Sequence, residues 1–214
     1  MRSKKQSEGQ SRTFVDDARR AQLIQCAIDA IDELGYKRAS LTEIATRAGI
    51  TKGAIFYHFA NREELINAVF LHVVNAGSTF ILAAVQAADT PRAQLRAYIS
   101  AFIEALSVDP KAIRVFFAIG RNLAEENTGK MWSEEAFAMQ EAAVAPLEDI
   151  LRRGQESGEF GEFDVRSMAL MIRGTTEMIP PYLDAYPTLD PVAYGKDLVL
   201  FIERACRVKR PVRP

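Results

Sequence analysis

Residues 40–59 constrain this chain most strongly, because they specify two short helices joined by a tight turn. Ser40 has Glu43 three residues after it, which is the spacing of a capping box. The first helix then carries apolar residues at helical spacing, namely Leu41, Ile44, Ala45 and Ala48. Gly49 follows where a sharp turn needs positive φ, and Thr51 can cap a second helix. The pattern predicts a capped helical hairpin whose inward residues on the second helix are Ile55 and Phe59.

Two short helices around a glycine-containing turn form a helix-turn-helix, whose second helix enters the major groove of DNA. Here that helix presents Lys52 beside the small residues Gly53 and Ala54, which allow close approach to base edges. Tyr57 and His58 can donate hydrogen bonds to phosphate oxygens at the rim of the groove. A helical hairpin with a purely structural role would show the same spacing of apolar residues. Such a hairpin would not be expected to place Lys, Tyr and His on its outer face. The residue types favour a DNA-reading helix.

The segment LTEIATRAGITKGAIFYHFANREEL resembles the DNA-binding signature of the TetR family of transcriptional regulators. The residues that carry the likeness are Ile44, Ala45, Ala48, Gly49, Lys52, Gly53, Tyr57, Phe59, Glu64 and Leu65. Arg62 stands where the family more often has Lys, and the retained charge implies a phosphate contact. The strong resemblance covers roughly residues 18–70. The set we expect to bind a double-stranded DNA operator is Thr42, Thr51, Lys52, Gly53, Ala54, Tyr57, His58 and Arg62.

Charge is unevenly distributed along the chain, although its net charge is only −1. Residues 1–62 hold eleven Lys and Arg against seven Asp and Glu, whereas the remainder holds 16 against 21. A basic N-terminal part and an acidic remainder suit a protein that presents one end to DNA. Residues 1–15 are polar and no apolar segment follows their basic residues, so we expect a disordered arm and no secretory signal. This arm either touches DNA or is a solvated tail.

The whole chain predicts an all-α fold of about nine helices, without alternating strand patterns. We expect a helix-turn-helix DNA-binding domain over residues 16–62 and a helical ligand-binding and dimerisation domain over residues 63–214. Thr90, Asp109 and Asp190 each precede a proline, and this pairing marks three helix starts. Asn61 followed by Glu64 forms a second capping box and begins a helix over residues 62–88 that would join the two domains.

The helix from Val165 is apolar on most of its faces, and such a helix must be buried on most of its sides. The last helix, over residues 191–207, offers a second apolar stripe made of Tyr194, Leu198, Phe201, Ile202 and Ala205. Two such helices from each of two subunits would form a four-helix bundle. The resemblance implies that these two helices form a homodimer interface. The two helix-turn-helix domains of the dimer would then bind the two half-sites of a pseudo-palindrome. Pro180-Pro181 should break or kink the first of the two helices.

The resemblance also implies that the domain over residues 63–214 binds a small-molecule effector. Aromatic, Met and hydroxyl side chains form adaptable pocket walls, and the candidates are Phe102, Phe116, Phe117, Trp132, Met139, Met171, Thr175 and Met178. For any single residue of this set, a place in the plain hydrophobic core is the favoured interpretation. The composition favours a mostly apolar organic effector, and no His, Cys and Asp cluster has metal-ligand spacing. No cofactor is implied.

Two other classes of function compete with a ligand-responsive regulator. An enzyme is disfavoured because the chain has no phosphate loop, no GxSxG elbow and no HExxH pair. A helical interaction protein that has lost DNA binding stays open, as does the choice between repressor, which we favour, and activator. Cys26 and Cys206 suit two unpaired thiols in a reducing compartment. We also find no apolar run approaching the roughly 20 residues of a membrane span, which predicts a cytoplasmic protein.

Overall fold

The computed structural model describes residues 2–126, 134–186 and 188–208, and within its helices it leaves undescribed the side chains of residues 2–15, 123–126, 134–137, 139–140, 177, 180–181 and 184. The described part of the chain contains ten helices and no strand, which agrees with the expected all-α fold. The chain divides into two compact units. The first comprises Met1–Asn75 with Lys111–Leu123, and the second comprises Ala76–Pro110 with Ala124–Pro214.

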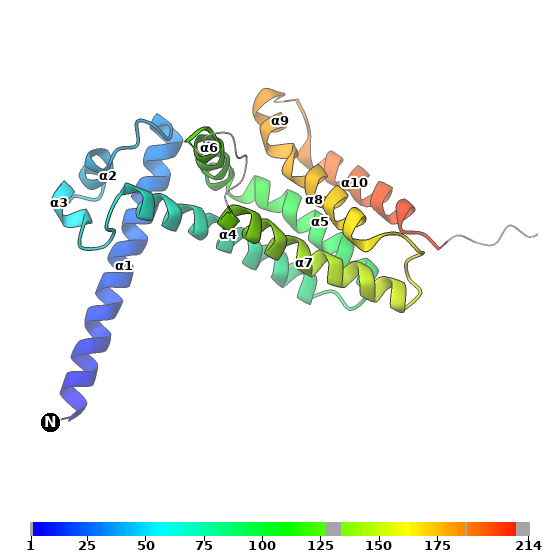
Figure 1. Cartoon of the computed structure of the whole chain (residues 1–214), viewed down its shortest axis with the longest axis horizontal. Coiled ribbons are helices and arrows are strands. Elements are labelled where there is room, and N and C mark those ends of the chain that lie inside the picture. Colours follow the sequence, from blue (N-terminus) through cyan, green and yellow to red (C-terminus); the bar gives the residue numbers. More distant parts are fainter. Residues whose placement is uncertain (1, 127–133, 187, 209–214) are drawn as a thin grey trace, which may run out of the picture. The chain divides into compact units, whose positions relative to one another are not determined.

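The first unit is built from α1 (Arg2–Leu34), α2 (Leu41–Arg47), α3 (Lys52–Ile55), the beginning of α4 (Arg62–Gln86) and most of α6 (Pro110–Glu126) (Figure 1). Its core joins all five helices and includes Leu23, Ile31, Ile44, Phe59 and Leu65. Helix α1 already begins at Arg2, so its bounds include the segment for which we expected a disordered arm.

The caps of the hairpin follow the sequence prediction closely. The Ser40 hydroxyl accepts a hydrogen bond from the Glu43 amide at 3.2 Å, and the Thr51 hydroxyl accepts one from the Ala54 amide at 3.3 Å. Gly49 turns the chain with φ of 68°, a value that L side chains rarely adopt. The capping box is only half formed, because the Glu43 carboxylate pairs with Arg47 instead of reaching back to the Ser40 amide.

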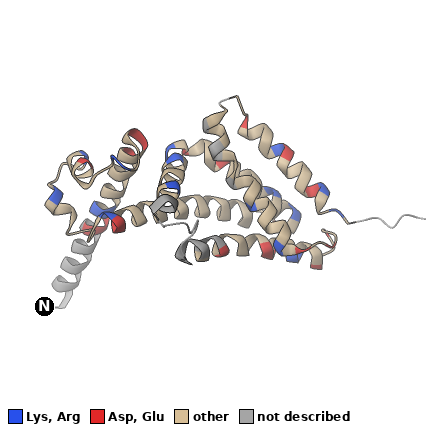
Figure 2. Cartoon of the chain, turned by 45° about the horizontal axis from the view of Figure 1, so that its top comes forward, with Lys and Arg blue, Asp and Glu red and all other residues tan. Residues whose placement is uncertain are grey.

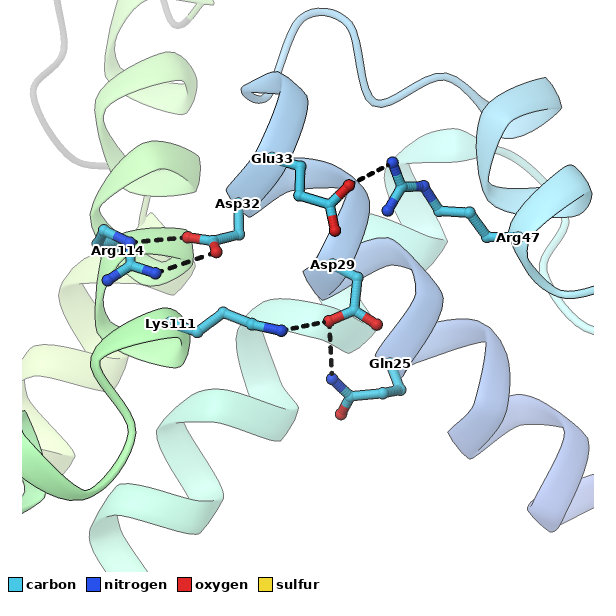
Figure 3. A network of polar contacts seen from close by, with 7 residues as sticks. All are labelled: Gln25, Asp29, Asp32, Glu33, Arg47, Lys111 and Arg114. Carbon is cyan, nitrogen blue, oxygen red and sulfur yellow. Dashed lines mark hydrogen bonds and ion pairs between the residues drawn. The ribbon is translucent and has the colours of Figure 1, made fainter.

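A network of charged side chains ties α6 to α1 within the first unit (Figure 3). The Lys111 ammonium lies 2.7 Å from the Asp29 carboxylate, and Arg114 makes two hydrogen bonds to Asp32 at 2.7 and 3.0 Å. On the other side of α1, Glu33 pairs with Arg47 at 2.8 Å. Hydrogen bonding raises the pKa of Lys111 and lowers the pKa of Glu33, so each pair favours its charged form.

The domain division differs from the expected boundary at residue 62. Leu65, Ile66, Val69 and Val73 of α4 are buried in the core of the first unit, and Val115 and Ile119 of α6 join them. The apolar faces of these two helices therefore complete a core that α1, α2 and α3 cannot close alone.

The second unit contains the end of α4 together with α5 (Pro91–Val108), α7 (Glu134–Glu156), α8 (Val165–Glu177), α9 (Ile179–Ala185) and α10 (Pro191–Ala205). Thr90 and Asp190 cap their helices with side-chain hydrogen bonds, as the sequence indicates, and Asp164 caps α8 in the same way. The expected break near Pro180 is present, since α8 ends at Glu177 and α9 begins at Ile179. This break accounts for the tenth helix.

The expectation about apolar runs is wrong for α4. This helix is 25 residues long, has no charged residue after Glu64, and is the one described helix long and apolar enough to cross a membrane by length and composition. Figure 2 shows the resulting long uncharged stretch of ribbon. One such helix is weak support for a membrane span, because the core helices of soluble proteins pass the same test. Four residues at the start of α4 are buried in the core of the first unit, whereas only 11% of the apolar window as a whole is buried.

Candidate nucleic-acid interface

The outward face of the hairpin is determined by two buried anchors on and after α3. Ile55 is 0% exposed and Phe59 is 1% exposed, and both belong to the core of the first unit. Because these residues are four apart on one face, the residues between and before them point outward. Tyr57 is accordingly 88% exposed, and Lys52 is exposed at the start of the helix.

Helix α3 itself is short. Its α-helical part covers only Lys52–Ile55, whereas the sequence predicts a helix through Phe59. The chain continues in turn geometry, with the Phe56 amide bonded to the Gly53 carbonyl at 3.3 Å and the Tyr57 amide bonded to the Ala54 carbonyl at 3.3 Å. This tighter winding leaves the exposed side chains on the same outer surface.

The predicted DNA-binding residues fall into two groups. Thr42, Thr51, Lys52, Gly53 and Tyr57 are exposed and Ala54 is half-buried, and all six belong to the hairpin of α2 and α3 or directly follow it. His58 and Arg62 are half-buried. The His58 side chain is 15% exposed, with its Nδ1 3.6 Å from the Asp16 carboxylate, and the Arg62 guanidinium is bonded to the Tyr36 carbonyl at 2.6 Å.

Two residues close to this surface lie outside the predicted DNA-binding set. Phe56 is 48% exposed beside Tyr57 and adds an apolar ring to the outer face. The four-residue spacing of Ile55 and Phe59 is a signal that could have placed it there. Arg20 donates to the His58 carbonyl from 38 residues away along the chain, and no local pattern indicates such a contact.

The candidate effector residues are divided between the two units. Phe116 packs against the core of the first unit, stacked on Phe70 with ring centroids 5.1 Å apart, and Phe117 contacts Phe116 edge-on. In the second unit Phe102 and Thr175 are half-buried. The remaining candidates are Met171 and Met178, which are 56% and 55% exposed, and Trp132 and Met139, which lie outside the described side chains.

Of the two cysteines, Cys26 is half-buried and Cys206 is buried. Cys26 and Cys206 are both free, and burial raises the pKa of Cys206 to about 11. A thiol with a raised pKa stays protonated at neutral pH and reacts slowly, which argues against a redox sensor at this position. Among the described residues, no group of His, Cys, Asp and Glu could hold a metal ion.

Both units match known families and folds. Residues 23–69 match the family model described as bacterial regulatory proteins, tetR family, and residues 88–180 match a tetracyclin repressor-like C-terminal domain. The HTH-type transcriptional regulator BetI of Burkholderia thailandensis is 30% identical over 175 residues, which cover 71% of this chain and 88% of that protein. BetI of Burkholderia mallei is 32% identical over 115 residues, covering 52% of this chain and 58% of that protein, so the match spans little more than half of that relative.

A solved structure shares the fold at lower identity. The transcriptional regulator FadR from Bacillus subtilis, solved in complex with stearoyl-CoA, superposes with a TM-score of 0.70 at 23% identity. The superposition covers 85% of this chain and 96% of that one. The likeness therefore extends through both units and is not confined to the hairpin.

Proposed function

Because the chain belongs to the TetR family of transcriptional regulators, whose members are not enzymes, we propose that it is a dimeric, ligand-responsive repressor. It binds a pseudo-palindromic operator through the hairpin surface and is released by a small, mostly apolar effector. Regulators of this family are soluble cytoplasmic proteins, and we propose the same location for this chain.

The observation that carries the proposal is the exposure of Lys52 on α3 and of Tyr57 in the turn after it, in a segment anchored to the core by Ile55 and Phe59. Lys52 supplies a positive charge for phosphate or for guanine acceptors, and Tyr57 supplies a hydroxyl donor for phosphate. Gly53 adds no side chain, so the backbone can approach the base edges closely. In this proposal Thr42 and Thr51 add hydroxyl donors at the same surface.

The dimer rests on an apolar face of the second unit. Helices α8 and α10 place part of their apolar residues in the unit's own core, including Met168, Ile172 and Leu198, and Ile179 of α9 is also buried. Others remain exposed, namely Leu170, Met171, Met178, Tyr182, Val192, Leu200 and Phe201. Exposed apolar patches of this extent mark interaction surfaces. We propose that a second copy of the chain covers this face, which would place the two hairpins on half-sites about 34 Å apart or a multiple of that distance.

The effector proposal rests on the composition of the second unit and on the FadR neighbour, which was solved with stearoyl-CoA. Phe102 on α5 and Thr175 on α8 combine an apolar wall with a hydroxyl group. We propose an effector with a long apolar part, such as an acyl chain. A ligand that favours one arrangement of the dimer by about 1–3 kcal/mol changes DNA affinity about 5- to 150-fold.

The test begins with selection of a duplex from a random pool by the full chain, followed by gel shifts with competitor DNA. The expected result is a complex that survives competitor on a pseudo-palindromic duplex and that weakens when stearoyl-CoA is added. A helical interaction protein without DNA function would select no duplex. Light scattering with a Phe201→Glu variant addresses the dimer, which should dissociate. A wild-type chain that is monomeric at all concentrations would refute that part of the proposal.

A further inference from the structure

We infer that Arg20 and Arg62 are positioning residues, which hold the two loops that flank the hairpin of α2 and α3, and that Arg62 is not a phosphate ligand. The inference rests on the proposed function, because it assigns how the DNA-reading surface keeps its orientation. It also departs from the phosphate contact that the sequence predicts for Arg62.

The Arg62 side chain is engaged by contacts within the protein. Its Nη2 donates to the Tyr36 carbonyl at 2.6 Å, and its guanidinium carbon lies 4.4 Å from the centroid of the Tyr36 ring. Tyr36 is 6% exposed and stands in the connection between α1 and α2, 26 residues before Arg62. One side chain at the start of α4 thus holds the loop that leads into the hairpin.

Arg20 makes the same pair of contacts at the other end of the hairpin. It donates to the His58 carbonyl, and its guanidinium carbon lies 4.1 Å from the centroid of the Phe59 ring, which is 1% exposed. Arg20 also lies 3.6 Å from the Glu64 carboxylate, which in turn accepts a hydrogen bond from the Ala60 amide at 2.7 Å. The loop that leaves the hairpin is therefore held from α1.

Both contacts need the planar guanidinium of arginine. A guanidinium can stack its face on an aromatic ring while its edge donates to a carbonyl, whereas an ammonium is a compact point charge that cannot do both. A phosphate contact does not require a planar guanidinium, because a lysine can make it as a point charge. The substitution Arg62→Lys therefore separates the two roles.

The two roles also differ in their effect on DNA. Non-specific binding depends mainly on the number of phosphates neutralised, whereas specific binding depends on correct placement of the groups that read base edges. Loss of a positioning residue should reduce affinity for the selected duplex and leave the salt dependence unchanged. Loss of a phosphate ligand should reduce affinity for every duplex and reduce the salt dependence.

The experiment measures binding of the full chain to a duplex selected by the wild type and to a scrambled duplex, each from low to high salt. The variants are Arg62→Ala, Arg62→Lys and Arg62→Gln, with Lys52→Ala as the matched control that removes an exposed positive charge from the hairpin surface. Far-UV circular dichroism checks that each variant is folded. Arg62→Gln keeps a planar amide donor for the Tyr36 carbonyl but has no charge, so it is informative even where Arg62→Ala fails to fold.

We expect Arg62→Ala and Arg62→Lys to lower affinity for the selected duplex, by roughly 10-fold for Ala, the scale of one lost charge-assisted hydrogen bond. The slope of log affinity against log salt should match the wild type in all three Arg62 variants, whereas Lys52→Ala lowers it by about 0.9 per lost phosphate contact. Arg62→Gln should bind the selected duplex better than Arg62→Ala. The inference is overturned if Arg62→Lys binds like the wild type, or if the neutral variants lower the slope as Lys52→Ala does. A wild type that selects no duplex would instead refute the proposed function.

Discussion

Replacing Ile55 by Ala perturbs the single buried residue of α3 and tests how the fold presents the DNA-reading surface. Ile55 is 0% exposed and belongs to the core of the first unit. Truncation of a buried Ile to Ala costs about 2–5 kcal/mol, and we expect about 3 kcal/mol because a four-residue helix can relax partly into the cavity. For a chain of this length that loss lowers the midpoint of cooperative thermal unfolding by roughly 6–12 °C.

Tyr57→Ala is the matched control, because Tyr57 lies two residues further along and is 88% exposed. An exposed substitution of this kind changes the free energy of unfolding by less than about 0.5 kcal/mol. We nevertheless expect it to weaken binding to all duplexes with little change in the salt slope, since the phosphate contact that it removes is made by a neutral hydroxyl. The two variants thus separate the contribution to the fold from the contribution to DNA binding.

The assay is urea unfolding followed by circular dichroism, combined with gel shifts on the selected duplex below the unfolding transition. Ile55→Ala should lose stability, whereas Tyr57→Ala should lose affinity with its stability intact. Equal loss of stability in the two variants, or an unchanged unfolding midpoint for Ile55→Ala, would mean that the faces of α3 are assigned incorrectly.

Three further experiments test other parts of the molecule. A double-mutant cycle on Asp32 and Arg114, measured by urea unfolding, should give a coupling free energy of about 0.5–1 kcal/mol. The coupling should be smaller in 1 M salt, because the arginine side chain is 48% exposed. A coupling that is unchanged in high salt would contradict this. The pKa of Cys206 is raised by burial from 9.0 to about 11, so its contribution to stability is complete below pH 9 and is lost as the pH rises toward 11. Cys206→Ala should reduce that alkaline loss in pH-dependent unfolding, and an identical alkaline profile would refute the assignment. Gly154→Ala should lower the free energy of unfolding by about 1–3 kcal/mol, because a Cβ there would lie 2.0 Å from the buried Phe160 ring. Gly77→Ala is the control, because a Cβ there would have nothing within 4 Å; it should be neutral or stabilising by up to about 1 kcal/mol in the same assay.

Much of the fold is determined by signals that act within a few residues of the chain. Ser40, Thr51 and Asp190 cap the helices for which they were predicted, because a capping side chain reaches only an amide two or three residues away. Gly49 adopts positive φ for an equally local reason. The outward direction of Tyr57 also follows from the sequence, since helical spacing separates it from Ile55.

The structure decided what depends on partners far apart in the chain. Arg62 has the charge of a phosphate ligand, and only the fold reveals that the Tyr36 carbonyl and ring engage it across 26 residues. Phe116 has the composition of a pocket residue, yet it stacks on Phe70 in the core of the first unit. Periodicity identifies an apolar face but not the surface that will cover it, because burial is set by whichever distant element fits against that face. Local hydrogen bonds and helical spacing are therefore readable from the sequence, whereas the pairing of charges and faces across the fold is a property of the tertiary structure.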